Sequence, residues 1–165
     1  MSHLSPSLYP QLKAAILADP TLSAYPNTTD GAYAMLPLLN VVAAPDWYVW
    51  RTDVTKDSLY FQISGEATTW EWTTFKAQST SEQGAWMEMF SGSVLNMALL
   101  SVRTGVEKIF GSVNAQTIHV KAISKRKATR AEKIFAVGLG LLATPATMVF
   151  EGMLDYTDVD NARHS

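Results

Sequence analysis

Signals that start and stop helices recur so closely along this chain that only short helices fit between them, and this constrains the fold most. Ser5 can cap a first helix, and Pro6 suits its first turn because a missing N–H costs nothing there. The pair Asp19-Pro20 stops that helix. Asp30 can cap a second helix, which Pro37 should kink. We therefore expect a mainly α protein, built as a bundle of short helices.

The middle of the chain carries the same punctuation. Ser79 or Thr80 can cap a helix, with Glu82 or Gln83 three residues later as a capping box. The clearest amphipathic helix covers 96–111, with apolar residues on one side and charged residues on the other.

Between residues 58 and 75 the apolar period changes from that of a helix to two. The alternating apolar residues are Leu59, Phe61, Ile63, Trp70 and Trp72. Alternation of this kind is typical of a β-hairpin. We expect a hairpin arm at 57–75, packed on this domain's own helices or on a neighbouring subunit, because an isolated hairpin is only marginally stable.

The C-terminal part also alternates. Met148, Phe150, Leu154 and Tyr156 favour a C-terminal strand, although Gly152 interrupts it. Residues 158–165 are polar, and we expect a flexible C-terminal tail there. The domain prediction is a single helical domain over 1–157.

Composition excludes several classes of function. The chain is 47% hydrophobic and 17% charged, which indicates a folded protein, and a net charge of −2 gives no global attraction to nucleic acid. Without cysteine there is no disulfide, thiolate zinc site or cysteine nucleophile. His3, His119 and His164 lie far apart, and no hydrolase, metalloprotease or phosphate-loop motif occurs. We expect no enzyme activity, no cofactor and no metal site.

Nothing in the sequence predicts a membrane protein. The first residues lack the basic and apolar regions of a signal peptide. The most apolar stretches, 32–44 and 134–143, fall short of the roughly 20 residues that a membrane-spanning helix needs. We expect a soluble, intracellular protein that does not contact a membrane.

The strongest local charge feature is a basic run with a balance of +5, counting six cations and Glu132. The cations are Lys121, Lys125, Arg126, Lys127, Arg130 and Lys133. On a helix, Arg130 lies one turn from both Arg126 and Lys133. Three interpretations stay open: a solubilising face, a contact with the phosphate backbone of DNA, or a contact with the acidic segment of a second copy. That segment contains Glu151, Asp155, Asp158 and Asp160.

Large aromatic residues are numerous for so short a chain. The rings considered are Tyr48, Trp50, Trp70, Trp72 and Trp86. Exposed rings would mark an interface, whereas buried rings would belong to the core. We expect Trp70 and Trp72 to be partly exposed before assembly. Together with Trp50, Glu151, Asp155 and Asp158, they are the candidate interface residues.

Four strings in this order and spacing carry a family resemblance. They are DGAYA at 30–34, VWRTDV at 49–54, RKATRAEKIFA at 126–136 and ATPATMVFEG at 143–152. The chain resembles, roughly from Leu12 to Val159, a family of small virion proteins from the head and neck gene region of tailed bacteriophages. Residues 57–69 and 118–124 depart from the family pattern.

The resemblance implies a structural role in the virion. The function it implies is that of a head–tail connector (adaptor or neck) subunit, forming a ring below the portal around the DNA channel. Such connectors are mostly helical and commonly form rings of twelve copies. The implied partners are further copies of the chain, the portal, other neck or tail proteins and packaged DNA. The implied location is the virion neck, with the host cytoplasm as the site of assembly. The alternative is a capsid decoration protein or a tail-associated protein.

In a ring, one surface of each copy meets a different surface of the next. The basic segment 121–133 and the acidic segment 151–160 could form such a pair, or the basic face could line the channel.

Overall fold

A computed structural model describes residues 4–61 and 68–165 and divides the chain into two compact units. Unit 1 takes the chain up to Val49 and again from Lys127 to Ser165, and unit 2 takes the residues between, Trp50–Arg126. The boundaries fall within two short strands, β1 (Tyr48–Trp50) and β4 (Lys125–Lys127). The single helical domain predicted over 1–157 stays a prediction, because two compact units can belong to one domain.

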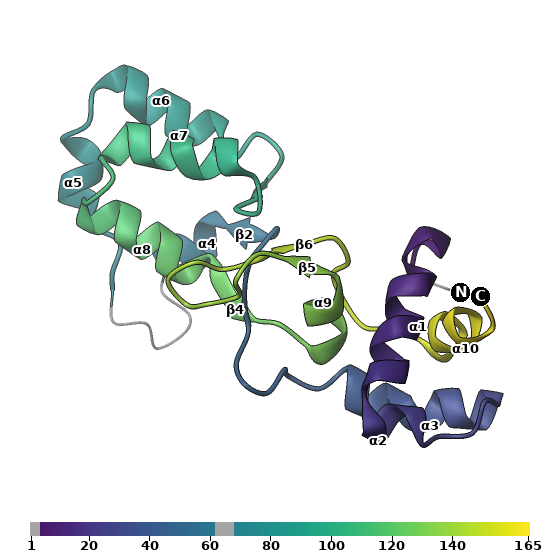
Figure 1. Cartoon of the computed structure of the whole chain (residues 1–165). Coiled ribbons are helices and arrows are strands. Elements are labelled where there is room, and N and C mark those ends of the chain that lie inside the picture. The colour runs from purple at the N-terminus through teal and green to yellow at the C-terminus, as the bar shows by residue number, and fades with distance from the viewer. Residues whose placement is uncertain (1–3, 62–67) are drawn as a thin grey trace. The chain divides into compact units, whose positions relative to one another are not determined.

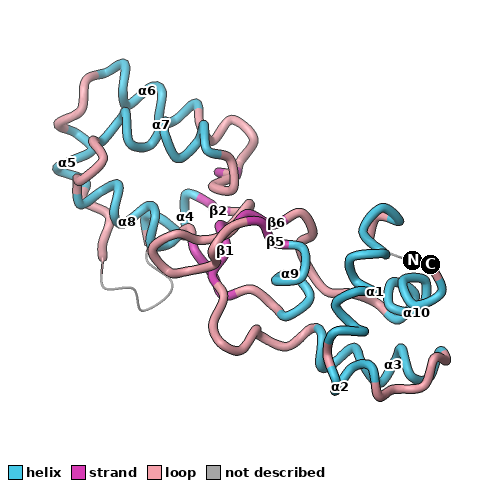
Figure 2. The backbone as a smooth tube through the Cα atoms, in the orientation of Figure 1, coloured by secondary structure: helices cyan, strands magenta, loops and turns pink. Residues whose placement is uncertain are grey.

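The mainly α class is confirmed: helices dominate, and the strands are two or three residues long (Figure 2). Unit 1 begins with a 3₁₀ turn at Pro6–Leu8. Its α-helices are α1 (Tyr9–Ala18), α2 (Pro20–Ser23), α3 (Thr29–Leu39), α9 (Arg130–Phe135) and α10 (Tyr156–His164). Its antiparallel strands β5 (Ala136–Val137) and β6 (Thr147–Met148) pair Ala136 with Met148 and Val137 with Thr147.

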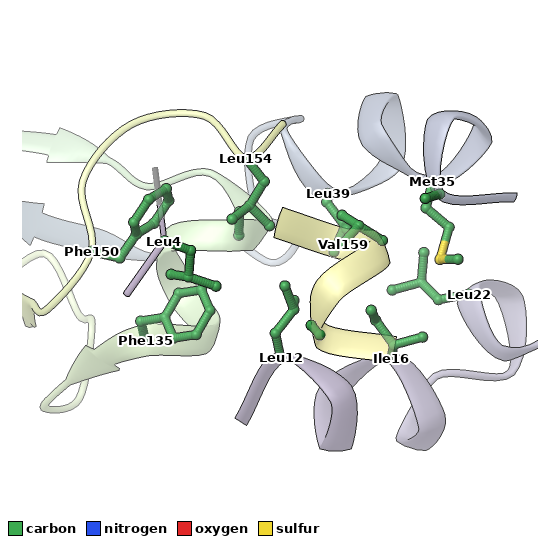
Figure 3. Close-up of a cluster of buried hydrophobic side chains, with 13 residues drawn as sticks. Leu4, Leu12, Ile16, Leu22, Met35, Leu39, Phe135, Phe150, Leu154 and Val159 are labelled. Atoms are coloured by element: carbon green, nitrogen blue, oxygen red, sulfur yellow. The ribbon is translucent and has the colours of Figure 1, made fainter. Parts of the chain in front are cut away.

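The main core of unit 1 joins both ends of the chain, because α10 packs on α1 and on α3 (Figure 1). Leu12 and Ile16 are four residues apart and lie on one face of α1, where both are buried. Figure 3 shows them gathered with Val159 of α10, and with Met35 and Leu39 of α3. Residues far apart in sequence therefore stabilise one core.

Helix α10 corrects the prediction of a flexible tail at 158–165. Asp155 and Asp158 form a capping box: the Asp155 side chain accepts from the Asp158 N–H, and the Asp158 side chain accepts from the Asp155 N–H. Val159 and Ala162 are buried in the core. The predicted C-terminal strand is present only as β6 (Thr147–Met148). Tyr156, which the alternating pattern assigns to that strand, is instead the first residue of helix α10.

Unit 2 consists of helices of different lengths around an aromatic core. Its elements are β2 (Val54–Thr55), α4 (Lys56–Tyr60), α5 (Trp72–Lys76), α6 (Thr80–Glu88), β3 (Val94–Leu95), α7 (Leu100–Phe110) and α8 (Ala115–Ile123). Strand β2 pairs antiparallel with β3, with Val54 opposite Leu95. Trp86 lies in this core, fully buried, and its indole N–H donates to the Tyr60 hydroxyl at 3.0 Å.

The hairpin predicted at 57–75 is wrong for the described residues of that segment. Thr55 caps α4 by accepting from the Ser58 N–H, so the first half of the segment is helical through Tyr60. The second half enters α5 at Trp72. Ile63, also used for the prediction, lies outside the described residues. The antiparallel pairs form elsewhere in the chain, as β2 with β3 and β5 with β6.

Candidate interaction surface

The cations of the basic run are engaged in local contacts. In unit 1, Lys127 pairs with Asp46 at 2.7 Å, and this hydrogen bond raises the pKa of Lys127. Arg130 pairs with Asp19, which also caps α2. The Lys133 ammonium lies 4.9 Å from the centre of the Trp47 ring. These contacts use the positive charges to stabilise unit 1 itself.

The same holds for the part of the run in unit 2. Lys121 of α8 pairs with Glu107 of α7, and Lys125 lies 5.6 Å from the centre of the Trp50 ring. Arg126 is near enough to Asp53 to contribute to the lowering of its pKa. Arg126 belongs to β4, so it does not share a helix with Arg130, contrary to the sequence expectation. A role of the six cations at an interface or in a DNA channel stays a prediction.

The acidic candidates fall into different environments. Glu151 is exposed, whereas Asp158 is fully buried and accepts from the Leu4 N–H at 2.9 Å. Asp158 therefore belongs to the core, which corrects its assignment to an interface. Burial acts on Asp155 to raise its pKa, but hydrogen bonds from Thr157 and from the Asp158 N–H outweigh burial and lower it. Asp155 acts as a helix cap.

Two of the three tryptophan candidates are also core residues. Trp50 and Trp70 are each only 7% exposed. Trp70 stacks on Trp86, with ring centres 5.4 Å apart, so its predicted exposure is wrong. Trp72 is 47% exposed, and its predicted partial exposure is confirmed.

The surface feature that the sequence analysis missed is the segment from Val137, the last residue of β5, through the connection to β6; it is called here the 137–145 loop. Four aliphatic side chains on it are more than half exposed. They are Val137 (67%), Leu139 (65%), Leu141 (56%) and Leu142 (57%). The sequence signal is a stretch without charge, because no charged residue occurs from Ile134 to Phe150. Exposed aliphatic residues gathered on one short loop are typical of an interaction surface.

The backbone of this loop is held in place. The Tyr48 N–H donates to the Gly140 carbonyl at 2.8 Å, and the Ala146 N–H donates to the Tyr48 carbonyl at 2.9 Å. Gly140 has φ +64°, and a Cβ there would lie 2.0 Å from the Trp47 ring. Only glycine permits both this conformation and this approach. The loop therefore presents its aliphatic side chains on a fixed backbone.

A second surface of unit 1 is a pocket beside the segment 41–44, called here the 41–44 pocket. Its lining residues are Asp19, Val41, Val42, Ala43, Ala44, Arg130, Lys133 and Ile134. The segment runs antiparallel to 128–130: the Ala43 N–H donates to the Ala128 carbonyl, and the Arg130 N–H donates to the Val41 carbonyl. Val41 and Val42 are each about half exposed. The pocket thus combines aliphatic residues with the charged side chains of Asp19, Arg130 and Lys133, beside a hydrogen-bonded backbone.

His119, one of the three histidines, has a structural role. It is fully buried in unit 2, where Nε2 bonds to the Leu59 carbonyl at 2.8 Å and Nδ1 to the Thr68 hydroxyl at 3.0 Å. Within residues 4–61 and 68–165, no three histidine, aspartate or glutamate side chains converge in the manner of a metal site. The helices of the same residues include none with the length and apolar character required to cross a bilayer.

Comparisons of this chain with protein families, with curated proteins and with solved structures found no match. Any function proposed for the chain therefore depends on its own surfaces and on its sequence.

Proposed function

We propose that this protein is a structural subunit of a tailed-bacteriophage virion, acting as a head–tail connector that forms a ring below the portal. The observation that supports this most is the 137–145 loop, where four aliphatic side chains stand exposed on a backbone fixed by Trp47 and Tyr48. A surface of this kind gains free energy when another protein covers it. The assignment to a tailed-bacteriophage particle comes from the resemblance of the four sequence strings to small virion proteins.

The magnitude of this gain is suited to repeated assembly. Full burial of an aliphatic side chain contributes about 1.5–3 kcal/mol relative to exposure. The four partly exposed side chains on each copy contribute less than the full value each, but a ring multiplies their sum because every copy makes the same contact. We therefore expect a single contact between two free copies to be weak. A closed ring is more stable, because each copy is held by contacts on both sides.

The experiment that tests the proposal is reconstitution on the portal. Purified chain is mixed with purified portal of the same phage, and the complex is analysed by size-exclusion chromatography with light scattering. The proposal predicts a complex with a fixed number of copies per portal ring. Failure to bind the portal, together with absence from purified virions by quantitative mass spectrometry, would overturn it. Hundreds of copies per virion would instead identify the protein as a decoration or tail component.

A further inference from the structure

We propose that another pocket of unit 1, called here the Arg163 pocket, binds a small carboxylate ligand that has a short aliphatic chain. The pocket has a volume of about 450 Å³ and is lined by residues of α1, by residues between 23 and 27, and by Arg163 of α10. All of these residues belong to unit 1. The site is therefore complete within one copy, and the inference does not depend on the proposed function.

First, the charged side chains of the pocket are cations. Lys13 and Arg163 line it, and none of the described residues that line it is an aspartate or a glutamate. Lys13 donates to the Ser165 main-chain oxygen, and Arg163 donates to the Tyr25 carbonyl at 3.0 Å. Within residues 4–61 and 68–165, neither cation forms an ion pair with a carboxylate side chain. Positive charge without a carboxylate side chain beside it favours an anion in the pocket.

Second, most donors of the Arg163 guanidinium have no acceptor. The group carries five N–H donors, and in the part of the chain that the structure describes only Nη2 forms a hydrogen bond. Nη1 is buried and has no hydrogen-bond partner. A buried donor without an acceptor lowers stability, so a ligand that supplies the acceptor is favoured. The side chain as a whole is only partly buried, and its planar fork matches the two oxygens of a carboxylate.

Third, the pocket also has an apolar part. Leu17 lies four residues after Lys13, on the same face of α1, and is 65% exposed. Ile16 and Tyr25 also line the pocket. Pockets for small organic ligands combine apolar walls with a few polar groups that fix the orientation. Inorganic phosphate would use the cations alone, whereas a carboxylate on an aliphatic chain would also cover Leu17.

NMR titration of the isotope-labelled full chain tests the assignment, since a ligand of this size binds weakly. The probe is hexanoate. It should shift the amide signals of Leu17, Asn27 and Gly31 and leave those of unit 2 unchanged. Gly31 is a reporter because a Cβ built on it would lie 3.1 Å from Arg163 Nη1.

Three further ligands separate the contributions of charge and chain. Hexanamide has the same chain without the charge, and it should bind about tenfold more weakly or worse, because the charge-assisted hydrogen bonds are lost. Acetate and inorganic phosphate keep a charge but lack the aliphatic chain, so both should bind more weakly than hexanoate.

Two substitutions of one exposed residue test the position of the site. Leu17→Glu brings a carboxylate to the pocket and should abolish hexanoate binding. Leu17→Gln has nearly the same shape without the charge, and it should weaken binding much less. Arg163→Gln should weaken binding by about tenfold or more. Lys108→Gln, at an exposed lysine of α7 in unit 2, is the matched control and should change nothing.

Thermal unfolding verifies that each variant is folded, and the Leu17 pair decides the test even if Arg163→Gln is unstable. Four outcomes would overturn the inference: hexanamide that binds as tightly as hexanoate, phosphate that binds as tightly as hexanoate, equal affinities of Leu17→Glu and Leu17→Gln for hexanoate, or signal changes spread over both units.

Discussion

Trp70 and Trp72 show that neighbouring tryptophans in the sequence can have different structural roles. It lies 7% exposed among the rings of Trp86, Tyr60 and Phe110, whereas Trp72, two residues later, is 47% exposed. Trp70→Ala should lower the free energy of unfolding by about 3–5 kcal/mol, because it removes a large buried side chain and leaves a cavity.

Chemical denaturation of the purified variant measures the effect, and Trp72→Ala is the control, with an expected loss well below that of Trp70→Ala. Equal losses for the two variants would show that Trp70 is not a core residue.

Asp53 is a residue for which the structure predicts a pH dependence. A hydrogen bond from the Arg51 guanidinium, at 3.0 Å, is the main cause that lowers the pKa of Asp53 below its ordinary value of 3.8. A carboxyl group with a lowered pKa in the folded state contributes stability above its unfolded pKa and loses it as the pH falls through the folded pKa.

Asp53→Asn should therefore reduce stability at neutral pH, by about 0.5 kcal/mol because the Asp53 side chain is exposed. The difference between variant and wild type should shrink as the pH falls below about 4. Thermal unfolding of both proteins across this pH range measures it. A difference that is constant with pH would mean that the Arg51 contact contributes nothing to stability.

Among the elements, helix α10 depends most visibly on its cap. Asp155 accepts from the Asp158 N–H at 2.9 Å and begins a helix that carries Val159 into the unit 1 core. Asp155→Ala should cost about 1 kcal/mol of stability, because it leaves helix N–H groups without an acceptor.

Asp155→Asn is the control for this cap, since an asparagine side chain also accepts the hydrogen bond. Amide hydrogen exchange should show faster exchange over α10 in Asp155→Ala than in Asp155→Asn. The same exchange rate in both variants would contradict the role of the cap.

A helix that begins with an unambiguous capping sequence can be predicted from the sequence. An element cannot be predicted in this way when its sequence pattern fits two structures. The capping box predicted from Ser79 and Glu82 is present at the start of α6. The period of two at 58–75 indicates strands, but the Thr55 cap and the burial of Leu59 favour helix α4. In α10, Asp155 and Asp158 form a capping box, yet in sequence alone they also match a solvated acidic segment.

Less of the candidate interaction surface can be predicted from the sequence. Which side chains are exposed for binding depends on contacts with residues elsewhere in the chain. The basic run is evident from composition, but the carboxylates that pair with its cations lie outside the run, at Asp19, Asp46 and Glu107. The glycines of the 137–145 loop indicate no more than the end of a helix and a following loop. The loop's exposure depends on Gly140 packing against Trp47, a contact that no spacing rule predicts.

At the scale of the whole molecule, the two units each have an aromatic or aliphatic core of their own. The cluster around Leu12 and Val159 lies in unit 1, and the cluster around Trp86 lies in unit 2. Unit 1 carries the exposed 137–145 loop, so we expect association of copies to depend on a unit 1 surface.

Salt then distinguishes the two kinds of subunit contact that the chain offers. A contact between the basic segment 121–133 and the acidic segment 151–160 would weaken as NaCl rises from about 0.1 M to about 1 M, since the Debye length falls from roughly 10 Å to roughly 3 Å. A contact made by the uncharged 137–145 loop has no such attraction to lose, and sulfate strengthens apolar burial. We expect the sedimentation-derived association constant to be unchanged by NaCl and raised by ammonium sulfate. An association constant that falls steadily with NaCl would assign the contact to the charged segments, because only charges brought together across an interface respond to screening in that direction.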